Sequence, residues 1–105
     1  MSVSREQSAL LVCFVVTADA EPSVLSRVVE YFAVLNILPD TVRLRRYING
    51  HLEITVKARG LDDARIDVVA NKLRQIVTVR QVMVEVFAAG GDISNYRDRQ
   101  QLAAQ

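Results

Sequence analysis

The segment from Leu10 to Ile37 changes its apolar period from strand to helix within a few residues, and this change constrains the fold more than any other feature. Residues 10–16 (LLVCFVV) form a continuous β-rich run, typical of a central strand covered on both faces. A tight loop follows, and apolar residues then recur at helical spacing. The predicted stripe consists of Val24, Leu25, Val28, Val29, Phe32 and Leu35, with Arg27, Glu30 and Tyr31 on the other side.

Proline residues mark both ends of this predicted helix. Pro22 ends the loop, and Ser23 is the predicted N-cap, whose hydroxyl would accept from backbone N–H groups of the first turn. The helix is expected to stop near Asn36, before Pro39. Because the unpaired N–H groups of a first helical turn form an anion site, this loop is a candidate ligand site.

Two alternating segments follow and are predicted to form a β-hairpin. Apolar and polar residues alternate in residues 41–45 and again in 51–58. A two-residue loop at Asn49 and Gly50 would turn the two apolar rows to opposite faces of the sheet. A three-residue loop that begins at Ile48, with Gly50 in a left-handed bulge position, avoids this. The resulting register pairs Leu44 with Ile54, Val42 with Val56 and Arg45 with Glu53.

A second helix and a last strand complete the predicted domain. Gly60 ends the third strand and Asp62 can cap the helix, whose apolar stripe is Ile66, Val69, Ala70, Leu73, Ile76 and Val77. Residues 81–87 then alternate as a strand. The order β-α-β-β-α-β with right-handed crossovers predicts an α+β, ferredoxin-like fold. Its antiparallel sheet has the order 4-1-3-2, with two helices on one face.

Two surfaces of this sheet are predicted to be open. The second strand, residues 41–47, is an exposed edge whose charges protect it from pairing with other sheets: Arg43, Arg45 and Arg46. Met83, Phe87 and one set of first-strand side chains lie on the face without helices. This mixed surface suits partial coverage by another chain.

The titratable residues argue against catalysis by this chain. One histidine, one cysteine and scattered carboxylates show neither metal-ligand spacing nor a nucleophile motif, so no catalytic residue, metal or cofactor is expected. His51 begins a strand and is interpreted as a solvated residue, the alternative being a ligand or pH switch. Cys13 is interpreted as a small core residue that forms no disulfide within the chain, in a reducing compartment.

Composition bounds the remaining function classes. The 105 residues fit one domain, with an N-terminal extension at 1–9, the domain at 10–87 and a polar tail at 88–105 that is mobile or docks on a partner. A net charge of +1 and a third strand without stacking aromatics give no reason to expect nucleic acid. The apolar run is too short for a membrane span of about 20 residues. With no export signal, the cytoplasm is the expected location.

The loop and first helix resemble an ACT domain, whose pattern is a Pro-Gly turn, a V-L-S-R-V helix, then Phe and Asn-Ile. The likeness covers residues 10–87, and the matching residues are Pro22, Val24 to Val28, Phe32, Asn36 and Ile37. Within the family, the segments LSRVV, LEITVKA and NKLRQIVTVRQV are similar to short, non-catalytic small subunits of acetolactate synthase.

The resemblance implies a regulatory subunit that stimulates or restrains a catalytic partner. The partner would be an acetolactate synthase chain of branched-chain amino-acid biosynthesis, and the thiamine diphosphate cofactor would belong to it. The chain itself would be a homodimer, paired through an edge carrying Val42, Arg43, Leu44 and Arg45. An amino-acid effector would contact backbone groups of Ser23, Val24 and Leu25, with Asn36, followed by Ile37, supplying an amide from across the interface.

Three positions leave alternatives open. The family's Gly after Pro is Ser23 here, and the Asn usually found two residues before the Pro is Ala20, whose side chain cannot hydrogen-bond a ligand. Asn36 either binds the effector or ends the helix in a left-handed turn. Two other functions therefore compete with the regulatory subunit: a stand-alone amino-acid sensor and a plain dimerisation module.

Overall fold

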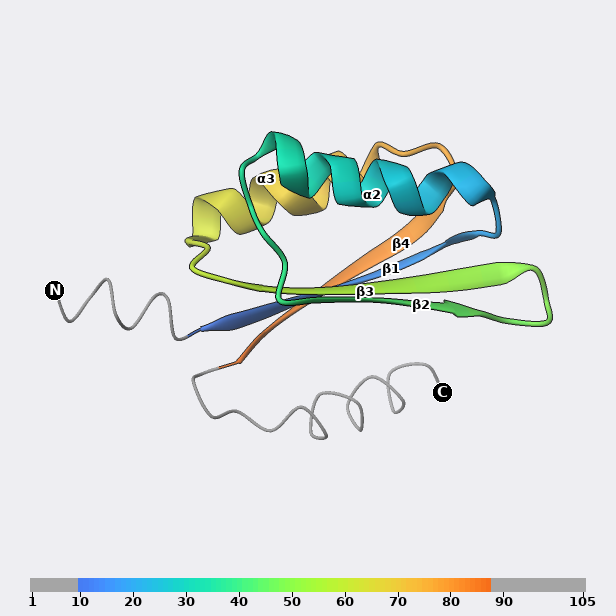
Figure 1. Cartoon of the computed structure of the whole chain (residues 1–105), viewed down its shortest axis with the longest axis horizontal. Helices are drawn as coiled ribbons and strands as arrows, with labels where there is room; N and C mark the ends of the chain where they lie inside the picture. The colour runs from blue at the N-terminus through green and yellow to red at the C-terminus, as the bar shows by residue number, and fades with distance from the viewer. Residues whose placement is uncertain (1–9, 88–105) are drawn as a thin grey trace, which may run out of the picture.

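The computed structural model describes residues 10–87, so the N-terminal extension and polar tail predicted at 1–9 and 88–105 lie outside the described residues. The elements follow the predicted order, with four strands and two helices. They are β1 (Leu11–Asp19), α2 (Pro22–Val34), β2 (Thr41–Arg46), β3 (His51–Arg59), α3 (Asp63–Arg74) and β4 (Val79–Phe87). The antiparallel sheet runs β2-β3-β1-β4, the predicted order read from the other edge, and both helices cover one face (Figure 1).

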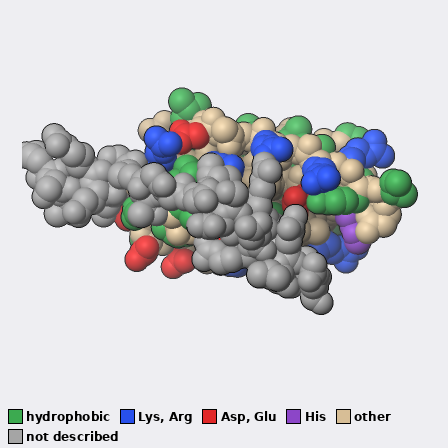
Figure 2. All heavy atoms as spheres, turned by 90° about the horizontal axis from the view of Figure 1, so that it is seen from below, with side chains coloured by type: hydrophobic (Ala, Val, Ile, Leu, Met, Phe, Trp, Pro, Cys, Tyr) green, Lys and Arg blue, Asp and Glu red, His purple; other side chains and the backbone are tan. Residues whose placement is uncertain are grey.

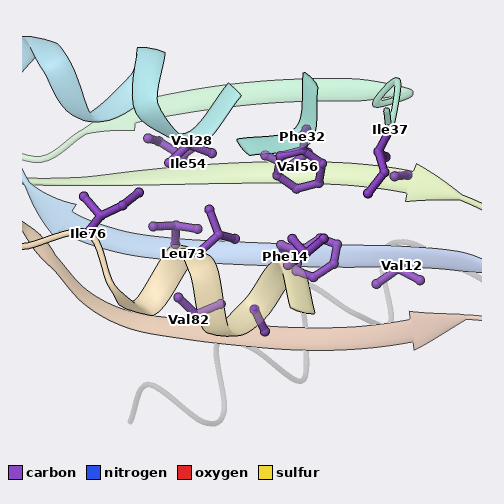
Figure 3. Close-up of a cluster of buried hydrophobic side chains, with 14 of the residues drawn as sticks. Val12, Phe14, Val28, Phe32, Ile37, Ile54, Val56, Leu73, Ile76 and Val82 are labelled. Carbon is purple, nitrogen blue, oxygen red and sulfur yellow. The ribbon is translucent and has the colours of Figure 1, made fainter. Parts of the chain in front are cut away.

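The main core lies between the helices and the sheet. In Figure 3, α2 places Val28 over Ile54 and Phe32 over Val56, so α2 covers β3. The other helix, α3, places Leu73 toward β1 and β4. The rings of Phe14 and Phe32 meet edge to face, with centroids 5.5 Å apart and planes at 75°. This contact joins the central strand β1 to α2, and both side chains are fully buried.

The predicted hairpin register is confirmed. Leu44 pairs with Ile54, Val42 with Val56 and Arg45 with Glu53. The Tyr47 N–H donates to the His51 carbonyl at 2.9 Å and closes a three-residue loop. Gly50 has a φ of +88°, the left-handed conformation that the loop requires. Loop length and apolar alternation therefore set this register together.

The start of α2 corrects one prediction. The N-cap is Glu21, which makes no side-chain capping bond, and Ser23 lies inside the helix. Pro22 occupies the first helical position because its fixed φ suits a helix and its missing N–H costs nothing there. The Ser23 carbonyl instead accepts a bond from the Ser26 hydroxyl at 3.0 Å. The predicted cap of α3 is confirmed, since an Asp62 oxygen accepts from the Arg65 N–H at 2.9 Å.

Two side chains and the length of the first strand differ from the predictions. Tyr31, predicted on the polar side of α2, packs against the core. The α3 helix lies on that flank, where the Arg65 side chain donates to the Leu35 carbonyl. Val77 is 97% exposed because α3 ends at Arg74 and the chain turns before β4. The first strand also continues past the predicted apolar run to Asp19, paired with β3 throughout.

Candidate functional site

The open edge of the sheet and the helix above it form one surface. All six residues of β2 are exposed, and β2 pairs only with β3 among the described residues, so alternate backbone groups face outward. Val28 is buried, and the next residue, Val29, is rotated by about 100° around the axis of α2. Val29 therefore lies on the side of α2 away from the flank that α3 contacts. Val29, Val42 and Leu44 are 39%, 41% and 43% exposed. We call this surface, residues 41–46 with Val29, the β2 border.

The two sides of β2 carry different chemistry. Val42 and Leu44 lie on the side that the helices cover, opposite buried residues of β3. Arg43 and Arg45 point to the other side. The Arg45 guanidinium carbon lies 5.5 Å from the centroid of the Tyr47 ring, and the Tyr47 hydroxyl donates to Glu53 at 3.4 Å. The β2 border therefore offers an apolar row and a basic row to any strand that pairs with it.

The predicted ligand residues fall at opposite ends of α2. Ser23, Val24 and Leu25 form the first turn, whereas Asn36 and Ile37 follow the last turn. Asn36 lies thirteen positions after Ser23, which corresponds to about 20 Å of helix. The Val24 N–H already donates to the Glu21 carbonyl at 3.2 Å. A single copy of the chain therefore does not bring the two halves of the predicted site together.

Asn36 and Ile37 end α2 in a Schellman motif. Asn36 has a φ of +60° and donates its N–H to the Ala33 carbonyl at 3.0 Å. The Ile37 N–H donates to the Phe32 carbonyl at 2.8 Å, and both side chains belong to the core cluster. The left-handed turn that the sequence allowed for Asn36 is thus present. Its side chain is exposed, and its role toward a ligand stays a prediction.

The sequence did not predict an ion pair that lies beside the β1–α2 loop. Arg80 binds Asp19 through two hydrogen bonds, from Nε to Oδ1 at 3.0 Å and from Nη2 to Oδ2 at 2.9 Å. This bidentate bond lowers the pKa of Asp19 and raises the pKa of Arg80. The next residue, Ala20, donates its N–H to the Gly50 carbonyl at 3.0 Å, which ties the loop to the hairpin turn.

We expect the Asp19 ion pair to make stability depend on acid pH. A carboxylate whose folded pKa is lowered stabilises the fold above its unfolded pKa, near 3.8 for Asp19, and this contribution disappears as pH falls through the folded value. Asp19→Asn should therefore be less stable than the parent at pH 7, and the difference should become smaller when the pH is lowered below 3.8, to pH 2. Urea unfolding at both pH values measures this. Asp67→Asn, on the exposed side of α3, is the control, and a difference of equal size at both pH values contradicts the prediction.

Other candidate sites do not coincide with this surface. A shallow pocket at the start of α3 is lined by Leu10, Leu61, Asp62, Asp63 and Ala64, none of them a predicted ligand residue. Within residues 10–87, no three His, Cys, Asp or Glu side chains come together as a metal site would require. Neither α2 nor α3 has the length and apolar character of a membrane-crossing helix.

Comparisons with known proteins agree on the fold. The sequence profile of the ACT-like domain family matches residues 4–90. The ACT domain of GTP pyrophosphokinase from Chlorobium tepidum is 12% identical, has a TM-score of 0.63, and is matched over 71% of this chain and 96% of that domain. The C-terminal domain of MgtC from Mycobacterium tuberculosis is 14% identical, with a TM-score of 0.61 over 79% of this chain and 90% of that domain.

A third similar structure contains the fold as part of a longer chain. A formyltetrahydrofolate deformylase from Pseudomonas putida is 13% identical, with a TM-score of 0.53 over 74% of this chain and 28% of that enzyme. No curated protein sequence matches this chain. The identities are low, so the solved structures support the fold alone. The family profile covers most of the sequence, and the chain therefore belongs to the ACT-like domain family.

Proposed function

We propose that this chain is a non-catalytic regulatory subunit that forms a homodimer through the β2 border, binds an amino acid between the two copies and acts on a separate catalytic protein. Membership of the ACT-like family supports a regulatory module. The observation that carries the proposal is the open β2 strand, with the two halves of the predicted ligand site at the two ends of the adjacent α2.

The direction of α2 explains how a dimer completes the ligand site. In the sheet β2 is parallel to β1, and α2 returns between them, so α2 runs antiparallel to β2. A second copy paired antiparallel through β2 therefore places its α2 antiparallel to the first. The start of one α2, at Ser23, then lies level with the end of the other, at Asn36. Within one copy, Ser23 and Asn36 are separated by about 20 Å along α2. Between two copies, Ser23 of one and Asn36 of the other lie at the same level along the helix direction.

Side-chain chemistry distinguishes the two registers that place a central residue of β2, Arg43 or Leu44, on the two-fold axis. In the first register, Arg43 lies opposite Arg43 of the second copy. Val42 of each copy then lies opposite Leu44 of the other, and Arg45 of each copy lies opposite Thr41 of the other. In the second register, Leu44 lies on the axis and Arg43 of each copy lies opposite Arg45 of the other. This register has two like-charge pairs, whereas the first has one. Like charges directly opposite each other destabilise a sheet, whereas apolar pairs stabilise it. The proposed dimer therefore has Arg43 on its two-fold axis.

An amino acid suits the site formed between the helix ends. Its carboxylate would lie at the first turn of α2, where the positive end of the helix dipole favours an anion. Its ammonium group would be met by the amide oxygen of Asn36 from the second copy. Ala20 and Ser23 differ from the pattern that the sequence resembles, so the effector bound here need not be the one bound by relatives.

Calorimetric titration with the branched-chain and other amino acids tests the site. We expect saturable binding of at least one amino acid by the parent chain and loss of binding in Asn36→Gly. Glycine keeps the left-handed φ of +60° without strain, so this variant removes the side chain and preserves the turn. Asn71→Ala, an exposed amide on α3, is the control. Equal binding by the parent and Asn36→Gly contradicts the ligand role of Asn36.

The catalytic partner is proposed from the sequence resemblance to acetolactate synthase small subunits. A subunit that binds one conformation of an enzyme better than another shifts the enzyme toward that conformation. The catalytic chain should therefore co-elute with this chain and change its activity on mixing. Unchanged activity and separate elution would remove this partner. Amino-acid binding without such an effect would favour a stand-alone sensor, and failure of both tests would leave a dimerisation module.

A further inference from the structure

The side of β2 and β3 that faces away from the helices carries more positive than negative charge. Arg43 and Arg45 of β2 lie on this side with Glu53 and Lys57 of β3. Figure 2 looks onto this face of the sheet, where Lys and Arg side chains lie along one long side. These four residues of the hairpin comprise three cations and one carboxylate. We call them the hairpin charge group.

Two cations of the hairpin charge group have no anionic partner. Arg45 lies opposite Glu53 in the sheet. Within residues 10–87, by contrast, the side chains of Arg43 and Lys57 form neither an ion pair nor a hydrogen bond. Arg43 lies opposite Thr55, and Lys57 follows two positions along β3, so the two cations are diagonal neighbours at about 7–8 Å. Arg43 is also exposed, and its guanidinium is therefore free to bind an anion from solution.

The proposed dimer concentrates this charge at its two-fold axis. With Arg43 on the axis, the two Arg43 residues lie directly opposite each other, with Cα atoms about 4.5–5.5 Å apart. The hairpin charge group has a net charge of +2 in each copy, three cations and one carboxylate, so two copies bring +4 to the axis. Thr41 and Thr55 lie among these charges on the same side of the hairpin and offer hydroxyl donors.

We propose that the dimer binds an anion with a diphosphate group on this axis, on the sheet face without helices. This inference rests on the proposed dimer, because one copy supplies only half of the site. Each Arg43 guanidinium presents a planar fork that can bind one phosphate group through two hydrogen bonds. Two such forks related by a two-fold axis match the two phosphate groups of a diphosphate.

The anion and the dimer stabilise each other. The two Arg43 side chains destabilise the free dimer, because like charges lie directly opposite each other. A diphosphate between them replaces this repulsion by attraction to both copies. Since the complete site exists only in the dimer, binding of the anion shifts the chain toward the dimer. A phosphorylated small molecule would thus control assembly at a site separate from the amino-acid site at the helix ends.

Sedimentation equilibrium with inorganic pyrophosphate as the probe tests this site. At a pyrophosphate concentration about 100 times its dissociation constant from the dimer, the dissociation constant of the dimer itself should fall about 100-fold. Sodium chloride at the same ionic strength should have a much smaller effect, because it screens the two charges without bridging them. Calorimetric titration should give one bound pyrophosphate for every two chains.

The substitution Arg43→Gln separates the anion site from the dimer interface. Without the like-charge pair, this variant should dimerise at least as tightly as the parent in the absence of pyrophosphate, and it should lose the response to pyrophosphate. A residue needed only for the interface would give the opposite result, a weaker dimer. Lys72→Gln is the control, because it removes one positive charge from the exposed side of α3 and should respond as the parent does.

The results that overturn the anion site differ from those that overturn the dimer. A parent dimer that pyrophosphate strengthens no more than sodium chloride does overturns the anion site and leaves the dimer in place. Binding of one pyrophosphate per chain, or an unchanged response in Arg43→Gln, also overturns the site on the axis. A parent that stays monomeric with and without pyrophosphate contradicts the dimer itself.

Discussion

Replacement of Phe14 by alanine is expected to lower the free energy of unfolding by about 3–5 kcal/mol, a large part of the 5–15 kcal/mol typical of a domain. Phe14 is 0% exposed and meets Phe32 edge to face, so the substitution removes apolar burial, a ring contact and the filling of the core at once. Urea unfolding followed by circular dichroism measures the change.

The control for Phe14 is Val77→Ala. Val77 is 97% exposed, so removal of its methyl groups should change the free energy of unfolding by less than about 0.5 kcal/mol. A loss below about 1 kcal/mol in Phe14→Ala would show that β1 and α2 do not share the tight contact described here.

The substitution Leu44→Asp is expected to weaken the proposed dimer at least about 100-fold, which corresponds to about 2.8 kcal/mol. In the register with Arg43 on the axis, Leu44 contacts Val42 of the second copy, and the two-fold repeats this contact. One substitution therefore places two carboxylates against apolar side chains. Sedimentation equilibrium across a range of concentrations measures the dissociation constant.

Val68→Asp is the matched control for this prediction. Val68 and Leu44 are both 43% exposed, but Val68 lies on α3, away from the β2 border. If both variants associate as the parent does, the β2 border is not the interface.

The register of the dimer has its own test. Arg43→Glu mixed with the parent should form heterodimers in preference to either homodimer, because the heterodimer has an opposite-charge pair on the axis.

The fold could be predicted because its information is local. The alternation of β2 and β3 and the three-residue turn from Ile48 to Gly50 leave one register that keeps both apolar rows on one face, and the structure has that register. The grouping of Met83 and Phe87 on the sheet face without helices also follows from strand alternation alone. Crossover handedness then restricts the strand order.

Features set by neighbouring elements were not predictable in the same way. Tyr31 is covered because α3 lies on that flank of α2, which the period of α2 alone cannot show. Arg80 and Asp19 are 61 residues apart in sequence and meet only because β4 pairs with β1. The N-cap prediction failed for a local reason, since Pro22 takes the first helical position and displaces Ser23 from the cap.

The hydrogen bond from Ala20 to the Gly50 carbonyl has a consequence for regulation. It joins the loop before α2 to the turn after β2, so a shift at either end of this bond strains the other. In the proposed assembly, effector occupancy and subunit association are then thermodynamically linked, and the linkage is reciprocal. An effector that tightens association must itself be held more weakly as the protein is diluted, so its apparent affinity would rise with the amount of protein present.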